Sequence, residues 1–170
     1  MKKLLFILLV VILGAVSVHA QDYSQAPKLP KLPKVHWVSW DESCDIAKNE
    51  EKVIMLDLYT EWCGWCKKMD KETFTDAEIV EIINNHFVAV KLNPEKKGQT
   101  FLYKGQSINS QQLLKLLAED EQVKYPAIIF YYPEHNEVFT EEGFQKPKSF
   151  KHLLKIYVNH NEKLNATALK

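Results

Sequence analysis

The strongest constraint on the fold is a pair of cysteines, Cys63 and Cys66, that follows an apolar run of strand length. The run covers residues 52–59 and leads into the cysteine motif, in the stretch LDLYTEWCGWCKKM. A helix is expected from Cys63 to about Lys71. The pair therefore lies at a strand-to-helix junction, where two cysteines at this spacing could bind a metal, anchor a haem or carry out redox chemistry.

The composition disfavours one class of protein, the nucleic-acid binders. The chain has 170 residues, 46% of them hydrophobic and 26% charged, which suits one globular domain with a substantial core. Basic and acidic side chains number 22 each, and every basic one is a lysine. A nucleic-acid binder would normally show a basic excess and use arginine, so we expect no nucleic-acid partner.

The N-terminus has the pattern of a secretory signal peptide over residues 1–20. Two lysines precede an apolar run that ends at Val18, and Ala20 offers a cleavage site. A retained membrane anchor is the alternative, but a run of about 15 residues is short for a helix that needs about 20 to span a bilayer. We therefore expect a periplasmic or secreted mature chain without membrane insertion, in a compartment where disulfides persist.

Residues 21–34 read QDYSQAPKLPKLPK, with three prolines at a three-residue spacing. This spacing favours an extended polyproline segment, so we interpret these residues as a semi-rigid tether. A docking ligand for a proline-reading domain is the alternative. Residues 35–170 are then expected to form a single domain.

The first half of this domain alternates helix and strand patterns. Asp41 is expected to cap a helix that ends near Glu50, and TDAE at residues 75–78 supplies a capping-box pattern for a later helix. Residues 86–93 return as a strand, so the order strand, helix, strand predicts a right-handed crossover and parallel strand pairs. The polar segment after residue 93 is interpreted as a loop.

Three further patterns complete the expected fold. Pro126 begins an apolar run, and a turn at PEHNE joins it to VFTEEGF, which together predict a hairpin. Pro147 suits the first turn of a closing amphipathic helix. Apolar side chains at helical spacing predict the buried faces of the last three helices: Ile79, Ile82 and Ile83; Leu113, Leu114, Leu116 and Leu117; and Phe150, Leu153, Leu154 and Tyr157.

Around Cys63 and Cys66, the sequence lacks the further ligands that a metal or a haem would need. A structural zinc site usually takes four nitrogen or sulfur ligands, but the six histidines are scattered singly, so we expect no metal. A c-type haem wants a histidine directly after Cys66, where Lys67 stands. A redox role fits better, because the N–H groups and dipole at a helix start stabilise a Cys63 thiolate within reach of Cys66. An inert structural disulfide is the alternative.

These segments resemble the thioredoxin superfamily. LDLYTEWCGWCKKM is similar to the family's active-site strand, turn and helix, VAVKLN to the next strand with its lysine, and KYPAIIFY to the segment whose cis-proline faces the disulfide. The order of elements fits from about Val35 to Asn161. The phrase CKKMDKETFTDAEI looks closest to an exported subfamily akin to the outer thioredoxin domain of the membrane thiol:disulfide interchange protein. The resemblance implies an α/β thioredoxin fold, with a central mixed β-sheet flanked by α-helices.

The resemblance also implies roles for individual residues. Cys63 would be the exposed nucleophile and Cys66 the resolving thiol. Asp57, six residues before Cys63, would be a buried acid whose raised pKa lets it take the proton of Cys66. A strand-end aspartate bonded to the backbone is the alternative. Lys91 would tune Asp57 electrostatically, unless it is an ordinary solvated lysine on a strand.

A substrate peptide would bind beside the cysteines. The resemblance implies a cis bond between Tyr125 and Pro126, next to backbone that pairs with the substrate as an added strand. The alternative is a trans proline that starts a strand. Trp62 and Trp65 offer flat apolar surface to an extended peptide, unless they simply pack over the helix end. Cys44, outside the motif, is expected to be a buried small apolar side chain rather than a reactive thiol.

The function implied is that of an exported protein thiol:disulfide oxidoreductase, which reduces disulfides in periplasmic or secreted proteins. It needs no cofactor beyond its own dithiol, and a reductase would need a membrane electron donor as a partner. Many thioredoxins have Gly-Pro between the cysteines, whereas this chain has Gly64-Trp65, which leaves the direction of electron flow open. The alternative is a thioredoxin-fold binding module whose Cys63–Cys66 bond is structural.

Overall fold

The computed structural model describes residues 33–118 and 123–168. The expected signal peptide, residues 1–20, and nearly all of the proline-rich segment, residues 21–34, lie outside the described residues. Within the part that is described, no helix is both long enough and apolar enough to cross a membrane.

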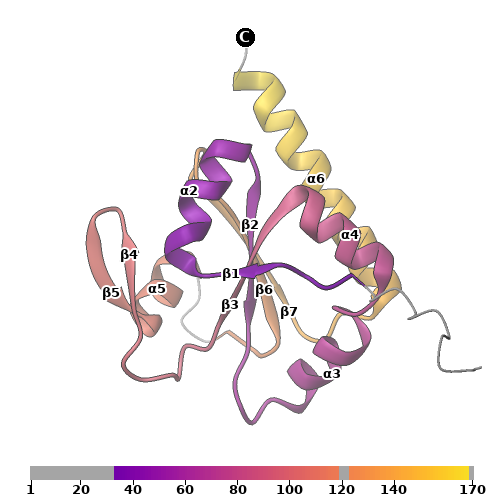
Figure 1. The fold of residues 1–170 in the computed structure, drawn as a ribbon, viewed down its shortest axis with the longest axis horizontal. Coiled ribbons are helices and arrows are strands. Elements are labelled where there is room, and N and C mark those ends of the chain that lie inside the picture. Colours follow the sequence, from indigo (N-terminus) through magenta and orange to yellow (C-terminus); the bar gives the residue numbers. More distant parts are fainter. Residues whose placement is uncertain (1–32, 119–122, 169–170) are drawn as a thin grey trace, which may run out of the picture. The chain divides into compact units, whose positions relative to one another are not determined.

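Five of the described strands form a central mixed sheet: β1 (Trp37–Val38), β2 (Val53–Leu58), β3 (Phe87–Leu92), β6 (Ala127–Tyr132) and β7 (Glu137–Glu142). Their order across the sheet is β1, β3, β2, β6, β7 (Figure 1). β1 and β2 run parallel to β3, which lies between them, whereas β6 runs antiparallel to β2 and to β7. The expected parallel pair and the expected hairpin are both confirmed.

Helices cover both faces of this sheet, as Figure 1 shows. They are α2 (Trp40–Glu50), α3 (Gly64–Glu72), α4 (Ala77–His86), α5 (Ser110–Leu117) and α6 (Pro147–Ala168). Side chains of α2 and α5 pack on one face, while those of α3, α4 and α6 pack on the other. The expected α/β fold, a mixed sheet flanked by helices, is therefore confirmed.

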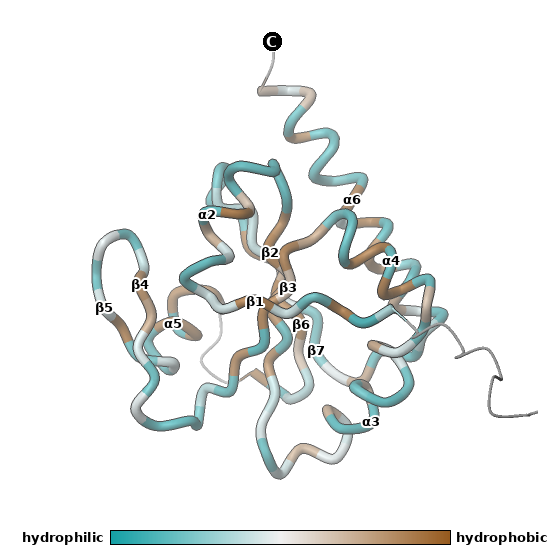
Figure 2. The backbone as a smooth tube through the Cα atoms, viewed as in Figure 1, coloured by the Kyte–Doolittle hydropathy of each residue, from teal (hydrophilic) through white to brown (hydrophobic). Residues whose placement is uncertain are grey.

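Successive side chains of β2 point to opposite faces of the sheet and so belong to two separate hydrophobic cores. Met55 belongs to the core under α4 and α6, whereas Ile54 and Leu56 belong to the core under α2 and α5. By the same alternation Asp57 lies on the α4 and α6 side. Figure 2 shows hydrophobic residues concentrated on the central strands, as expected for strands that are buried on both faces.

The start of α2 differs from the expected one. Ser39, not Asp41, is the N-cap: its hydroxyl accepts the N–H of Glu42, and the Glu42 carboxylate accepts the N–H of Ser39, which completes a capping box. The carboxylate of Asp41 instead accepts the N–H of Leu102 at 2.7 Å. A tertiary contact has therefore replaced the local cap that the sequence predicted.

The structure also differs from two other expectations for the helices: the N-cap of α4 and the buried face of α5. Asp76, not Thr75, caps α4 by accepting N–H groups of its first turn. The Thr75 hydroxyl instead donates to the Lys71 carbonyl of α3 at 2.6 Å. On α5 the expected burial of Leu116 is wrong: it is 51% exposed, while the other three leucines of that helix are buried.

The segment interpreted as a loop after residue 93 contains a hairpin of two short strands, β4 (Thr100–Tyr103) and β5 (Gln106–Asn109). The hairpin lies beside α2, as a hydrogen bond of 3.2 Å from Trp40 Nε1 to the Leu102 carbonyl shows. Lys104 and Gly105 make its tight turn, both with positive φ. Only every second residue of β4 is even partly buried, so its apolar alternation is too weak to recognise in the sequence.

Candidate active site

Cys63 and Cys66 lie at the start of α3, beyond the end of β2. Cys63 is the N-cap residue, and its Sγ accepts the N–H of Cys66 at 3.0 Å. The N–H of Cys63 donates to the Thr60 carbonyl at 3.2 Å, which closes the turn between strand and helix. The two cysteines form a disulfide, with their Cα atoms 5.3 Å apart. The expected strand-to-helix junction is therefore confirmed.

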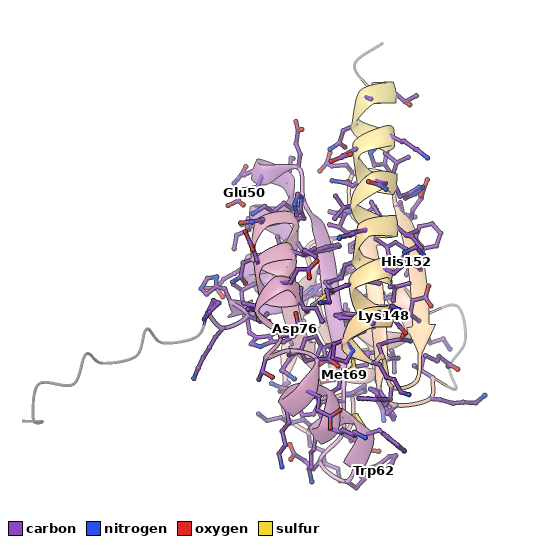
Figure 3. All side chains as sticks on the ribbon, turned by 90° about the vertical axis from the view of Figure 1, so that its right-hand side faces the viewer. Glu50, Trp62, Met69, Asp76, Lys148 and His152 are labelled. Carbon is purple, nitrogen blue, oxygen red and sulfur yellow. A yellow bond between two sulfur atoms is a disulfide. The ribbon has the colours of Figure 1, made fainter. Side chains whose placement is uncertain are left out.

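The disulfide is covered, although the residues beside it are exposed. Cys63 is only 4% and Cys66 only 5% exposed, so the expectation of an exposed Cys63 is wrong for this oxidised form. The Cys63 side chain turns back over the first turn of the helix to join Cys66, which hides its sulfur. Trp62 and Trp65, in contrast, are 67% and 58% exposed. Figure 3 shows Trp62 at the end of the described domain, beside α3.

Asp57 is buried and forms an ion pair with Lys91. The two residues are register partners on the parallel strands β2 and β3, so their side chains share one face of the sheet. Lys91 Nζ lies 2.7 Å from Asp57 Oδ2, and Asp57 is only 3% exposed. Burial raises the pKa of Asp57 from its usual 3.8 to about 6, against the opposing attraction of Lys91.

The ammonium group of Lys91 has more partners than the sequence indicated. Asp70 Oδ1 lies 2.6 Å from the same Nζ. The rings of Trp37, Tyr59 and Phe74 have their centroids 4.8, 5.2 and 5.4 Å from it. Burial disfavours the charged form, but the paired carboxylates outweigh it and hold the pKa of Lys91 above its usual value. The alternative of an ordinary solvated lysine is therefore wrong.

α3 brings the disulfide to the face on which the buried acid lies. Met69 of α3 packs in the same core as Met55 of β2, and Asp70 reaches the strand lysine that pairs with Asp57. Asp70 stands four residues after Cys66, a spacing that marks the same helix face and could have identified it. The three rings come from separate segments with no common sequence signal, so sequence reasoning missed them.

Tyr125 and Pro126 stand directly before β6, and the peptide bond between them is cis, as expected. Because β6 pairs with β2, this turn lies at the same end of the sheet as the disulfide. The Tyr125 ring meets the Trp62 ring edge-on, with centroids 6.0 Å apart. Trp62 Nε1 donates to Glu95 Oε2 at 2.9 Å. Trp62 is thus tied to two other segments while its ring stays exposed.

Trp65 has partners of its own, which sequence reasoning also missed. Its ring centroid lies 5.3 Å from that of Phe144, a residue that follows β7. Lys68 Nζ lies 5.1 Å from the Trp65 centroid and 5.2 Å from the Phe144 centroid. Only the return of the chain after β7 brings Phe144 to α3, so local spacing could not have revealed this contact.

Cys44 lies on α2, apart from the disulfide, and it is half-buried rather than fully buried. Burial raises the pKa of its thiol, which keeps it protonated and weakly nucleophilic. In the described residues no group of three or more His, Cys, Asp and Glu side chains is placed to hold a metal ion.

The fold is that of the thioredoxin superfamily. A solved thioredoxin from Thermus thermophilus superposes with a TM-score of 0.56 at 16% identity, covering 73% of this chain and 87% of that one. A solved structure named DsbH oxidoreductase gives a TM-score of 0.58 at 21% identity, covering 79% of this chain and 92% of that one. At these identities the likeness concerns the fold alone.

Within that superfamily the chain belongs to the family Thioredox_DsbH, described as a protein of unknown function, DUF255, whose model matches residues 28–167. The chain is also similar to the thiol:disulfide interchange protein DsbD of Haemophilus influenzae, at 28% identity over 112 residues or 65% of this chain. The match spans only 17% of the length of that relative. The expected likeness to its thioredoxin domain is confirmed.

Asp57→Asn is expected to stabilise the oxidised protein at neutral pH and to have no such effect near pH 4. Because burial raises the pKa of Asp57 from 3.8 to about 6, the folded state favours the protonated carboxyl. That favourable contribution is complete below the unfolded pKa and is lost as the pH rises through about 6. The amide cannot ionise, so the variant should gain up to about 3 kcal/mol above pH 7.

Urea unfolding at a series of pH values measures this gain. Asp45→Asn, which removes an exposed carboxylate from α2, is the control and should show no comparable pH-dependent gain. A constant difference between Asp57→Asn and the unsubstituted protein from pH 4 to pH 8 would contradict the raised pKa.

Proposed function

We propose that the chain is an exported protein thiol:disulfide oxidoreductase that reduces disulfides in periplasmic or secreted proteins. The observation that carries this proposal is a disulfide at the start of a helix that is linked, through Asp70 and Lys91, to a buried carboxyl with a pKa of about 6. Such a carboxyl can exchange a proton near neutral pH, which an inert structural disulfide does not require. The similarity to a relative named thiol:disulfide interchange protein supports the same proposal.

Cys63 of the reduced protein would begin the reaction. The free N–H groups and the dipole at the start of α3 favour its thiolate, and the N–H of Cys66 is directed at its Sγ. The thiolate attacks one sulfur of the substrate disulfide and forms a mixed disulfide with it. The other substrate sulfur leaves as a thiolate and takes a proton from solvent.

Cys66 and Asp57 would complete the reaction. With a pKa of about 6, Asp57 is mostly ionised at neutral pH and can accept the proton of the Cys66 thiol. The Cys66 thiolate then attacks the Sγ of Cys63, the second substrate sulfur leaves, and the Cys63–Cys66 disulfide forms. Two electrons pass from the dithiol to the substrate without a further cofactor. Lys91 keeps the pKa of Asp57 from rising further.

The substrate peptide would bind across the surface formed by Trp62, Trp65 and Tyr125, beside the buried Pro126. The two tryptophans present exposed apolar rings on either side of Cys63 in the sequence. A Cβ placed on Gly64 would meet no atom within 4 Å outside its chain neighbours and its own helix backbone, so the space at Gly64 itself is open. An extended peptide could pair with the backbone beside the cis-proline as an added strand.

The location and partners follow from the sequence pattern and remain part of this proposal. Residues 1–20 would be removed as a signal peptide, residues 21–34 would tether residues 35–170, and the mature chain would work in the periplasm or outside the cell. Its substrates would be disulfide-containing proteins. Each turnover oxidises the dithiol, so a membrane electron donor would have to reduce it again.

A thioredoxin-fold binding module with a structural Cys63–Cys66 bond is the second candidate. It is favoured by the burial of both cysteines, which are 4% and 5% exposed. A module of this kind would hold client proteins on the exposed tryptophans without electron transfer. The two candidates differ in turnover, which can be measured directly.

The mature chain is expected to accelerate the reduction of insulin by dithiothreitol, followed as the turbidity of the precipitating insulin B chain. Cys63→Ser should abolish this acceleration because it removes the nucleophile. Cys44→Ser is the matched control and should retain the activity, since Cys44 lies apart from the disulfide on α2. No turnover above that of Cys63→Ser would contradict the oxidoreductase and favour the binding module.

The reduction potential of the Cys63–Cys66 pair is expected to lie near that of thioredoxin, at about −270 mV, as a reductase requires. Equilibrating Cys44→Ser protein in glutathione buffers of graded ratio, followed by trapping of free thiols, measures this potential for the pair alone. A value near about −120 mV would identify an oxidant and contradict the proposed direction of electron flow.

Asp57→Asn is expected to slow the resolution of the mixed disulfide about tenfold or more at neutral pH, because it removes the base that accepts the Cys66 proton. The deficit should shrink above about pH 9, where the thiol ionises without help. Acid quenching during single turnover, followed by non-reducing electrophoresis, would detect the longer-lived intermediate. Equal lifetimes in both proteins at neutral pH would contradict the role of Asp57.

A further inference from the structure

Two rings and one ammonium group form a partly exposed surface on one side of the disulfide, which we call the Trp65 ledge: Trp65, Phe144 and Lys68. The Trp65 and Phe144 centroids lie 5.3 Å apart, and Lys68 Nζ lies 5.1 and 5.2 Å from them. Trp65 is 58% exposed although its ring is apolar. A large exposed ring beside a reactive site is an expected feature of a binding surface.

The ledge is held in place by the segment that follows β7. The N–H of Gly143 donates to the Pro126 carbonyl at 2.7 Å, and the Thr73 hydroxyl at the end of α3 donates to the Gln145 carbonyl at 2.7 Å. These bonds flank Phe144 on both sides. A partner that binds here would therefore meet rings that are already in position, which lowers the entropy cost of binding.

The order of strands places the Glu95 carboxylate and the Lys68 ammonium on different sides of the disulfide. The sheet runs β3, β2, β6, β7. Glu95 follows β3, Cys63 follows β2, Pro126 precedes β6 and Phe144 follows β7, all at one end of the sheet. Glu95 and Phe144 therefore lie on opposite sides of the disulfide. The side of Trp62 carries the Glu95 carboxylate, and the side of Trp65 carries the Lys68 ammonium.

The charge of Lys68 is accessible to a partner. Its nearest carboxylate, that of Glu72, lies 3.9 Å away, and both side chains are about half exposed, at 44% and 51%. A surface pair of this kind contributes little stability, so a partner's carboxylate could replace it at small cost. The Glu95 carboxylate, which accepts the Trp62 indole N–H, would in contrast repel an acidic side chain placed directly against Trp62.

We propose that the Trp65 ledge docks an acidic side chain, next to an apolar one, that flanks the reactive cysteine of the substrate. The inference rests on the proposed oxidoreductase function and adds the class of sequence that it selects. The apolar side chain packs on the rings of Trp65 and Phe144, and the acidic one pairs with Lys68. The same charge on the Trp62 side meets Glu95, so the substrate binds in one direction across the disulfide.

Four synthetic peptides test the inference. Each carries one cysteine linked by a disulfide to thionitrobenzoate, with a leucine next to it and an aspartate or a lysine beyond, on the N-terminal side in one pair and on the C-terminal side in the other. Attack of the Cys63 thiolate on the peptide sulfur breaks that bond and releases the coloured thionitrobenzoate anion, which gives the rate. Cys66 then displaces the peptide as its free thiol.

In one of the two placements the aspartate peptide should react about threefold faster than the lysine peptide at low salt. The preference should shrink in about 0.5 M salt, which screens exposed charges. Lys68→Glu should reverse it for that placement. Equal rates for all four peptides, or an unchanged preference in Lys68→Glu, would overturn the inference.

Two further variants and one small compound complete the experiment. Lys71→Glu makes the same charge change at an exposed position of α3 and should keep the preference. Phe144→Ala should slow all peptides of the preferred placement about threefold. Lys71→Glu should not alter the rate with cysteine thionitrobenzoate, which lacks the flanking residues. If that compound reacts and insulin is turned over while the peptides show no preference, the ledge alone is wrong; if both reactions fail, the proposed function is wrong.

Discussion

The buried carboxyl of Asp57 is the constraint around which the rest of the site is built. A carboxylate on a central strand loses its hydration, which costs several kcal/mol unless other groups compensate. The parallel register of β2 and β3 places Lys91 beside Asp57, with Lys91 Nζ 2.7 Å from Asp57 Oδ2. Even so the pKa of Asp57 rises to about 6, so burial outweighs the attraction of the lysine. The carboxyl is therefore buried but able to lose and regain its proton near neutral pH.

Lys91, which forms the ion pair with Asp57, also joins α3 to the sheet. Lys91 bonds Asp70 of α3 at 2.6 Å, and three aromatic rings surround its ammonium group. Aromatic faces attract a cation that has lost part of its water, so they help to keep Lys91 charged in this place. The helix that begins at the cysteine pair is thus bonded to the partner of the buried acid, so one side chain contacts both α3 and Asp57.

The sequence predicted the parts of the structure that depend on short-range patterns. The apolar run before Cys63 predicted β2, and helical spacing predicted most of the buried positions on α4, α5 and α6. It failed where distant segments compete for a polar group. Asp41 looked like a helix cap but bonds the β4 strand, and the contact of Phe144 with Trp65 depends on how the chain returns after β7. Only the folded chain brings these partners together.

Trp65, the tryptophan between the cysteines, makes contacts that its position in the motif does not indicate. Its ring lies against Phe144 and Lys68, with more than half of its surface exposed. Meanwhile nothing beyond the neighbouring residues approaches Gly64. The Gly64-Trp65 pair therefore combines open space at Gly64 with a large apolar surface beside a covered disulfide. Under the proposed function, Trp65 would act chiefly on what can reach Cys63, since a partner that fits the ledge would gain contact area beside the sulfur.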